Sequence, residues 1–325
     1  SISGTGANDE TLSGLAYGPL SSSRWGIKGK EDLGGGYGAF FALESEVHND
    51  TGYAGGNNKT GSGAGDVYWK RKSIIGMKTP AGKVSFGLNK TADKVLATKY
   101  DMIGSNFAGF KTMSDYIAIG DRIDNGIFFE SNKIDGLGGK FYFDHQFGEV
   151  AGESSGNTRT GLGATFKVAG INGFVAYSEA KGSTGSSDWD QYGIGISYKT
   201  DNKIVFKAQY WDLSAESNAD STSGLGYSAD GEGYSLSVMG PISKHTKIGL
   251  GFHSSEQSDN EAEKIEMTQL AMLHSFSKKV TGYVMLGNLD NGASANHELH
   301  KKGFSSQPAN GGDQDGFAVG LRIKF

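Results

Sequence analysis

Apolar residues alternate with small or polar residues in many short segments of the chain. In residues 316–325, every second position from Phe317 to Phe325 is apolar, and Gly, Ala, Arg and Lys occupy the positions between. A period of two is typical of a β-strand that has one apolar face. The same pattern recurs in 39–47, 161–168, 192–199 and 246–253. The pattern therefore predicts an all-β chain.

The connections between the predicted strands are alternately short and long. The short ones are 31–36, 80–82, 169–170, 200–202, 243–245 and 277–279. The long ones are rich in Gly, Ser, Asn and Asp and lie at roughly 49–66, 91–121, 149–157, 182–190, 215–231, 256–264 and 290–315. Short turns at one end and long loops at the other are typical of an antiparallel up-and-down meander. A repeat of about 20 residues predicts about sixteen strands, each long enough to cross a bilayer when tilted.

The strand count leaves the start of the chain open. Fifteen candidate strands lie between Arg24 and Phe325. A barrel that starts and ends on the short-turn side has an even number of strands. We therefore expect a first strand before Arg24, although neither Ser1–Thr5 nor Thr11–Gly18 alternates clearly.

A large soluble β-sandwich would show the same alternation, with its apolar face turned into a core. Two features favour a membrane barrel instead. Aromatic residues lie near strand ends, as in the pairs Tyr192 with Tyr198 and Phe317 with Phe325, where they would form girdles at the membrane interfaces. A closed barrel also leaves no exposed sheet edge. We predict one domain, 1–325, that forms a transmembrane antiparallel up-and-down β-barrel.

The composition excludes several classes of protein. The 325 residues include 36 acidic and 31 basic side chains, so the basic excess of a nucleic-acid-binding protein is missing. The sequence has no Cys for disulfides or metal sites. Gly accounts for 52 residues, and in-strand glycines such as Gly193, Gly195, Gly249, Gly251 and Gly320 lie opposite the apolar face. We expect these glycines to leave space in a water-filled lumen. The negative mean hydropathy, −0.41, then reflects a polar lumen.

Three short motifs suggest chemistry but fit loops better. Gly152–Gly156 matches G-x-S-x-G, yet the following residues predict a strand where a nucleophile elbow needs a helix. His297–His300 has the wrong spacing for a zinc motif. Asp313–Gly316 offers carboxylates for Ca²⁺ but lacks the rest of an EF-hand loop. We predict no cofactor, with structural Ca²⁺ at the loops as a weak alternative.

The segment Ser23–Glu44, SRWGIKGKEDLGGGYGAFFALE, resembles the signature near the start of Gram-negative trimeric general-diffusion porins, particularly their anion-preferring proteobacterial branch. Further matches are Lys70–Ser73, Arg122–Gly126 and the terminal Phe325, which in this family is the signal for outer-membrane assembly. The resemblance extends over the chain from Ser23 onward and is specific at these points.

The resemblance implies a homotrimer of barrels in the bacterial outer membrane, surrounded by lipid bilayer and lipopolysaccharide. In this family the third long loop folds into the lumen and narrows it. The candidate is 91–121, whose segment Tyr100–Phe110 is apolar enough to pack against a wall. The Gly-rich loop 49–66 would contact a neighbouring barrel.

The resemblance also implies a charged constriction. Its basic cluster would consist of Arg24, Arg71, Arg122 and Lys28. Period two supports Arg24, because Trp25 and Ile27 take the opposite face, but Lys70 and Lys72 alternate against Arg71. Each arginine has the alternative of a solvated or interfacial charge. The loop acids Asp93, Asp101, Asp115 and Asp121 would face the arginine wall, and the lumen wall would also carry Glu44 and Glu46.

These features predict a passive porin for small hydrophilic solutes and ions, with a preference for anions if the basic cluster outweighs the acids. Arginine stays charged at any relevant pH, so the filter would not switch off by deprotonation. A channel specific for one solute is an alternative, since loop side chains decide specificity. A barrel enzyme is a weaker alternative, because His145 has an outward position without an obvious Ser partner.

Overall fold

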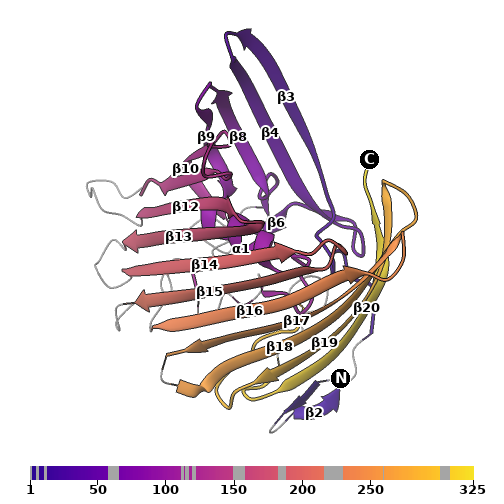
Figure 1. Cartoon of the computed structure of the whole chain (residues 1–325). Helices are drawn as coiled ribbons and strands as arrows, with labels where there is room; N and C mark the ends of the chain where they lie inside the picture. Colours follow the sequence, from indigo (N-terminus) through magenta and orange to yellow (C-terminus); the bar gives the residue numbers. More distant parts are fainter. Residues whose placement is uncertain are drawn as a thin grey trace.

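The computed structural model describes residues 2–4, 7–10, 13–57, 66–110, 113, 117–118, 122–148, 158–181, 188–215, 230–258, 260–300 and 308–325. Within these residues, eighteen strands form one sheet (Figure 1). Its long strands are β3 (Arg24–Gly34), β4 (Tyr37–His48), β8 (Lys72–Lys78), β9 (Gly82–Lys90), β10 (Arg122–Ser131), β11 (Phe141–Gln146), β12 (Thr158–Val168), β13 (Ile171–Lys181), β14 (Trp189–Lys199), β15 (Val205–Ala215), β16 (Gly231–Pro241), β17 (Thr246–Gln257), β18 (Asn260–Ser275), β19 (Val280–Asn291) and β20 (Asp313–Ile323).

The long strands form the predicted up-and-down meander. Each pairs antiparallel with the next long strand along the chain, from β3–β4 and β4–β8 to β19–β20. The short strands are β1 (Ile2–Gly4), β2 (Ala7–Glu10), β5 (Tyr53–Ala54), β6 (Gly56–Asn57) and β7 (Asp66–Val67). Of these, β1 pairs with β2 and with the start of β20, β5 pairs with β4, and β6 pairs with β7.

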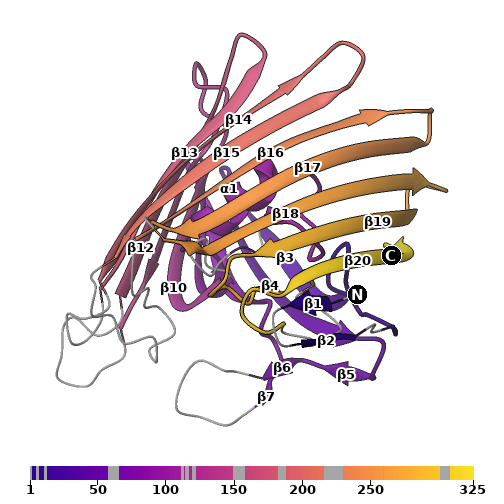
Figure 2. The ribbon, with the colours of Figure 1, turned by 90° about the horizontal axis from the view of Figure 1, so that it is seen from below.

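The predicted strand count is confirmed for the fifteen strands from Arg24 onward. Among the described residues before Arg24, the short strand β1 pairs with β20 through Ile2 and Ser3, so it is the structural counterpart of the weak sequence signal. The sheet curls around the molecule and brings β3 and β20 to the same side (Figure 1). Figure 2 shows the curved wall from below, with α1 (Ala92–Tyr100) on its concave side.

The apolar face of the sheet points outward, as the barrel hypothesis requires. On β14, Tyr192 is 56% exposed, and Ile194 and Ile196 are about half exposed. Their neighbours Gly193 and Gly195 face the inside, since an added Cβ there would meet buried aromatic rings. A soluble sandwich would bury the first set and expose the second. The outward alternation therefore identifies a lipid-facing wall.

The connections follow the predicted alternation, with departures at 256–264 and at the end of 182–190. At 256–264, β17 continues to Gln257 and β18 begins at Asn260, so a tight hairpin replaces the expected long loop. Likewise β14 begins at Trp189, inside the predicted loop 182–190. The segment between β10 and β11 is an extended turn, in which Ile134 and Gly139 form a β-bridge.

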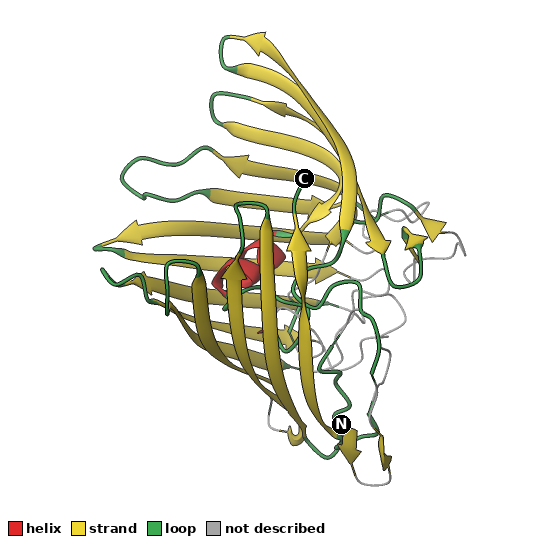
Figure 3. Ribbon diagram, turned by 90° about the vertical axis from the view of Figure 1, so that its right-hand side faces the viewer, coloured by secondary structure: helices red, strands yellow, loops and turns green. Residues whose placement is uncertain are grey.

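Helix α1 lies inside the barrel (Figure 3), where its buried side chains join a hydrophobic core. Thr91 caps α1 by accepting a hydrogen bond from the Lys94 N–H at 3.1 Å, and Asp101 ends the helix by donating its N–H to the Ala97 carbonyl at 2.9 Å. Acidic Asp93 in the first turn and basic Lys99 in the last suit the helix dipole. No helix among the described residues is long and apolar enough to cross a bilayer.

The in-strand glycines do face the lumen, but the expectation that they leave room for water is wrong for several of them. A Cβ at Gly163 would lie 2.7 Å from Leu96 of α1, and one at Gly249 would lie 2.8 Å from Met102. At Gly287 and Gly316 the space is taken by Phe107. These glycines make room for the inward-folded loop.

Candidate functional site

Basic and acidic side chains meet on the inner face of β3 and β4. The strand register places Arg24 opposite Glu46 and Gly26 opposite Glu44, so all these positions share the inner face. Arg71 lies between the two carboxylates: its Nε is 2.8 Å from Glu44 Oε1, and its Nη1 is 3.9 Å from Glu46 Oε1. Arg24 Nη1 lies 3.8 Å from Glu44 Oε1. Two acids and two arginines thus form one network.

Arg71 enters this network because it precedes its strand. It belongs to the turn before β8, and its backbone N–H donates to the Glu44 carbonyl at 3.2 Å. The alternation of Lys70 and Lys72 therefore does not determine its direction, and its side chain is buried between the carboxylates. Lys70 contributes as well, with its Nζ 3.2 Å from Glu46 Oε2.

Arg122 joins the cluster from β10. Its Nε donates to the backbone carbonyl of Arg71 at 2.5 Å. The structure thus brings together Arg24, Arg71 and Arg122, which come from three separate segments of the wall. Lys28 lies on the same inner face of β3 but is exposed.

Lys72 is a member of the cluster that the sequence prediction missed. The register pairs it with Glu44 on the inner face, and it interacts electrostatically with both Glu44 and Arg122. The signal for this in the sequence was weak, because Ile74, which shares the inner face of Lys72, is as apolar as the outward Ile75.

The loop acids within the described residues lie elsewhere, so the expected placement opposite the arginines is corrected. Asp93 is fully buried and forms an ion pair with Arg159, which also pairs with Asp144. Asp101 is fully buried at the end of α1. The remaining two predicted loop acids, Asp115 and Asp121, lie outside the described residues.

The group formed by Asp93, Arg159 and Asp144, which we call the loop anchor, joins α1 to the wall. Asp144 on β11 accepts the Ala92 N–H at 2.6 Å, so it binds both the helix start and the arginine. The pKa of Asp93 is raised to about 6, because the effect of burial outweighs the opposing effect of the nearby Arg159. Sequence reasoning missed Arg159, although β12 alternation places it on the face of Gly161 and Gly163.

Polar side chains of the wall bind the rest of the loop backbone. Gln209 Nε2 donates to the Ala97 carbonyl at 3.2 Å, and Gln269 Nε2 donates to Ser105 Oγ at 2.7 Å. Gln191 Oε1 accepts the Ala118 N–H at 2.6 Å. These contacts come from β14, β15 and β18, opposite the strands that carry the arginines. The described residues of the loop are therefore attached to this side of the lumen.

Apolar packing reinforces this attachment. The ring centroids of Tyr100 and Phe174 are 4.7 Å apart, and those of Phe174 and Trp211 are 5.5 Å apart. Leu96 and Phe110 are also fully buried. Burial raises the pKa of Tyr100 to about 12, so its hydroxyl stays neutral in this setting.

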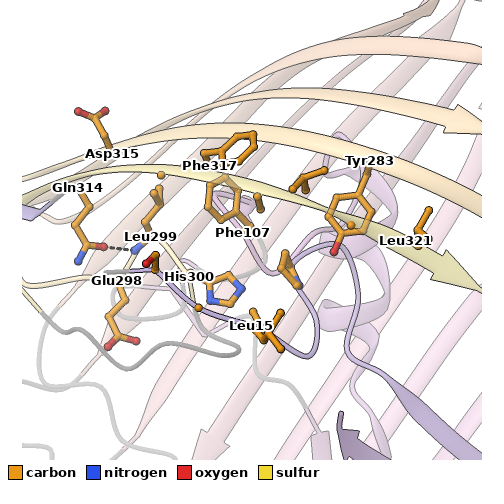
Figure 4. Close-up of a pocket in the computed structure, with 18 of the residues that line it drawn as sticks. Leu15, Phe107, Tyr283, Glu298, Leu299, His300, Gln314, Asp315, Phe317 and Leu321 are labelled. Atoms are coloured by element: carbon orange, nitrogen blue, oxygen red, sulfur yellow. Dashed lines mark hydrogen bonds between the residues drawn. The ribbon is translucent and has the colours of Figure 1, made fainter. Parts of the chain in front are cut away.

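A separate cavity of about 760 Å³ lies along β20 (Figure 4). Its labelled residues include Leu15, Phe107, His300 and Phe317, and the Leu299 N–H donates to Gln314 Oε1 at 2.7 Å. Both faces of β20 contribute to the lining, which shows that the cavity follows the strand edge. Its lining includes none of the cluster arginines, and it is not assigned as the constriction.

The other candidate groups have structural contacts. His145 shares a hydrogen bond of 3.0 Å with Thr160 Oγ1 and packs on Phe147. Asp313 accepts the Asn291 N–H, and Asp315 accepts from Asn288 Nδ2, each at 3.2 Å. Across the described part of the chain, no group of three or more His, Cys, Asp and Glu is arranged to hold a metal ion. Gly152–Gly156 lies outside the described residues. Phe325 is fully exposed, and its role in assembly stays a prediction.

Comparison with known proteins identifies the family. The family described as Gram-negative porin matches residues 2–294. The chain is 25% identical over 333 residues to outer membrane porin protein 32 of Delftia acidovorans, covering 96% of this chain and 87% of the relative. The anion-selective porin from Comamonas acidovorans has the same fold, with a TM-score of 0.77 at 22% identity and coverage of 96% and 92%. OmpT of Vibrio cholerae in its trimer form has a TM-score of 0.66 at 14% identity, with coverage of 93% and 91%. The chain therefore belongs to the Gram-negative porin family, and its sheet is the wall of a channel in the bacterial outer membrane.

Proposed function

We propose that this porin conducts small hydrophilic solutes passively and prefers anions. The observation that carries the preference is the convergence of Arg24, Arg71 and Arg122 on one wall. Lys28 and Lys72 add positive charge on the same inner face, where Glu44 and Glu46 pair with the arginines and Glu130 acts on Lys72. Fixed cations beside a narrow aqueous path stabilise a passing anion and repel a cation.

The position of the loop supports the same proposal. Asp93 pairs with Arg159 away from the arginine wall, so its charge is balanced locally. The similarity in fold to an anion-selective porin is consistent with this selectivity. Arginine remains protonated throughout the physiological range, so we expect the preference to persist between neutral and mildly acidic pH.

Reversal potentials in planar bilayers test the selectivity. Under a KCl gradient we expect a reversal potential directed toward chloride, and Arg24→Gln together with Arg122→Gln should shift it toward potassium. Lys133→Gln, an exposed position in the turn after β10, is the matched control and should leave it unchanged. A cation-directed potential in the unmodified protein would contradict the anion preference. A lack of ohmic conductance would contradict the channel itself.

We also infer a homotrimer in contact with lipid and lipopolysaccharide. A solved relative, OmpT of Vibrio cholerae, is described in a trimer form, and the outward apolar band of this chain suits a lipid environment. Light scattering in mild detergent should give three times the mass of one chain. A monomer under these conditions would contradict the trimer.

A further inference from the structure

A small basic cavity lies inside the barrel at its short-turn end. It has a volume of about 140 Å³ and is lined by Met102, Lys203, Val205, Lys207, Ser237, Met239 and Lys247. Three of the lining residues are lysines and none is acidic. The lysines come from β15, β17 and the turn before β15, whereas the arginine cluster is built on β3, β10 and the turn before β8. The cavity is thus a second basic region, distinct from the arginine cluster.

Strand geometry directs two of the lysines inward. The register pairs Lys207 with Ser237 on the inner face, and it pairs Lys247 with Pro241. Ile248, the neighbour of Lys247, is 38% exposed on the outer face, which fixes the inward direction of Lys247.

The third lysine is placed by a tight turn. Lys203 has a φ of 65°, a left-handed conformation that is uncommon for residues other than Gly. Two backbone hydrogen bonds of 2.9 Å hold this turn, from Lys203 N–H to the Thr200 carbonyl and from Thr200 N–H to the Ile204 carbonyl. The turn thereby brings a third cation to the same cavity.

The three ammonium groups differ in their hydrogen-bond and ion-pair partners. Lys207 Nζ donates to the carbonyls of Asp101 at 2.6 Å, Lys99 at 3.0 Å and Met102 at 3.3 Å, and the Asp101 carboxylate also interacts with it. Among the described residues, the ammonium groups of Lys203 and Lys247 have no hydrogen-bond or ion-pair partner. Two available cations therefore adjoin the hydroxyl of Ser237, over a floor fixed by Lys207.

We propose that this cavity is an anion-binding site on the short-turn side of the constriction, which takes a small oxyanion of two charges, a phosphate or a dicarboxylate. Lys203 and Lys247 would each give a charge-assisted hydrogen bond, and Ser237 would donate its hydroxyl proton. The site rests on the proposed anion preference and extends it to a second basic region of the lumen. Its cations, however, are independent of Arg24, Arg71 and Arg122.

Block of chloride current by inorganic phosphate tests the site. Single channels are recorded in dilute KCl, where screening is weak, while phosphate or succinate is added to one side and then to the other. Saturable block by either anion supports the site, and the lower half-blocking concentration names the preferred class. We expect Lys203→Gln with Lys247→Gln to raise the half-blocking concentration about tenfold, because each of these exposed ammonium groups should contribute about as much as a surface ion pair.

Matched controls separate this site from the constriction. Lys244→Gln with Lys278→Gln removes two charges from other short turns outside the cavity and should leave the block unchanged. The Lys203 and Lys247 variant should keep the chloride-directed reversal potential, whereas the Arg24 and Arg122 variant should change that potential and keep saturable block. Block that does not saturate, or that is unaffected in the Lys203 and Lys247 variant, would overturn the site. Saturable block in a pore without anion preference would overturn the proposed function alone.

Discussion

At the level of single residues, Arg71 is the side chain that connects the other members of the basic cluster. Its guanidinium contacts Glu44 and Glu46, and its carbonyl accepts from Arg122. An arginine suits this place because its planar group can contact two carboxylates while it stays charged. The net charge of the lumen wall therefore depends on Arg71 both as a cation and as the partner of two acids.

Arg71→Gln should shift the reversal potential toward potassium about as much as Arg122→Gln, since each removes one positive charge from the same wall. Both variants are compared in the same KCl gradient. A shift in Arg71→Gln far below that in Arg122→Gln would contradict a contribution of Arg71 to the selectivity.

Asp93 gives the protein a specific pH dependence. Burial raises its pKa from the usual 3.8 to about 6. As the pH falls from 6 toward 3.8, the folded chain therefore binds a proton at Asp93 before the unfolded chain does. The contribution of this group to stability is therefore present at low pH and is lost as the pH rises through 6. Asp93→Asn should flatten the change in melting temperature between pH 7.5 and pH 5 in detergent. Asp135→Asn, in an exposed turn, is the control, and an unchanged slope in Asp93→Asn would contradict the assignment.

At the level of elements, the strands were predictable because lipid on one side and an inner face on the other impose a period of two. The hairpin at Gln257 and Asn260 was missed because its strands extend into polar residues, which resemble a loop in composition. The direction of Arg71 was ambiguous because alternation holds only within a strand. The loop anchor was missed because Asp93 and Arg159 are far apart in sequence and meet only when α1 folds into the lumen.

The loop anchor should control how firmly α1 is held. Arg159→Met leaves two buried carboxylates without their cation, which we expect to cost about 3–5 kcal/mol. The loop should then detach from its wall, and single-channel recordings should show larger current noise and altered conductance. Arg159→Lys retains the charge, so its current noise should be lower than that of Arg159→Met. If Arg159→Met has the same conductance and current noise as the unmodified protein, an anchoring role is contradicted.

At the level of the whole molecule, the lumen is divided into two unlike halves. Over β12 to β20, inward glycines and apolar side chains accommodate α1 and the residues that follow it. Over β3 to β10, the wall carries the arginines, whereas Gln209 and Gln269 bind the described part of the loop on the other side. The inward glycines of β12 to β20 thus serve close packing of the loop.

This division predicts that a side chain added behind α1 will narrow the pore. Even a Cβ at Gly163 would lie 2.7 Å from Leu96 and 3.7 Å from Ala92, so Gly163→Val should displace α1 toward the arginine wall at a cost of about 1–3 kcal/mol. We expect a lower single-channel conductance, opposite to the effect of a detached loop. Leu162→Val, on the outward face of the same strand, is the matched control and should leave conductance unchanged. An unaltered conductance in a folded Gly163→Val protein would mean that the wall moves outward in place of the helix, and that the loop position is set by its polar anchors alone.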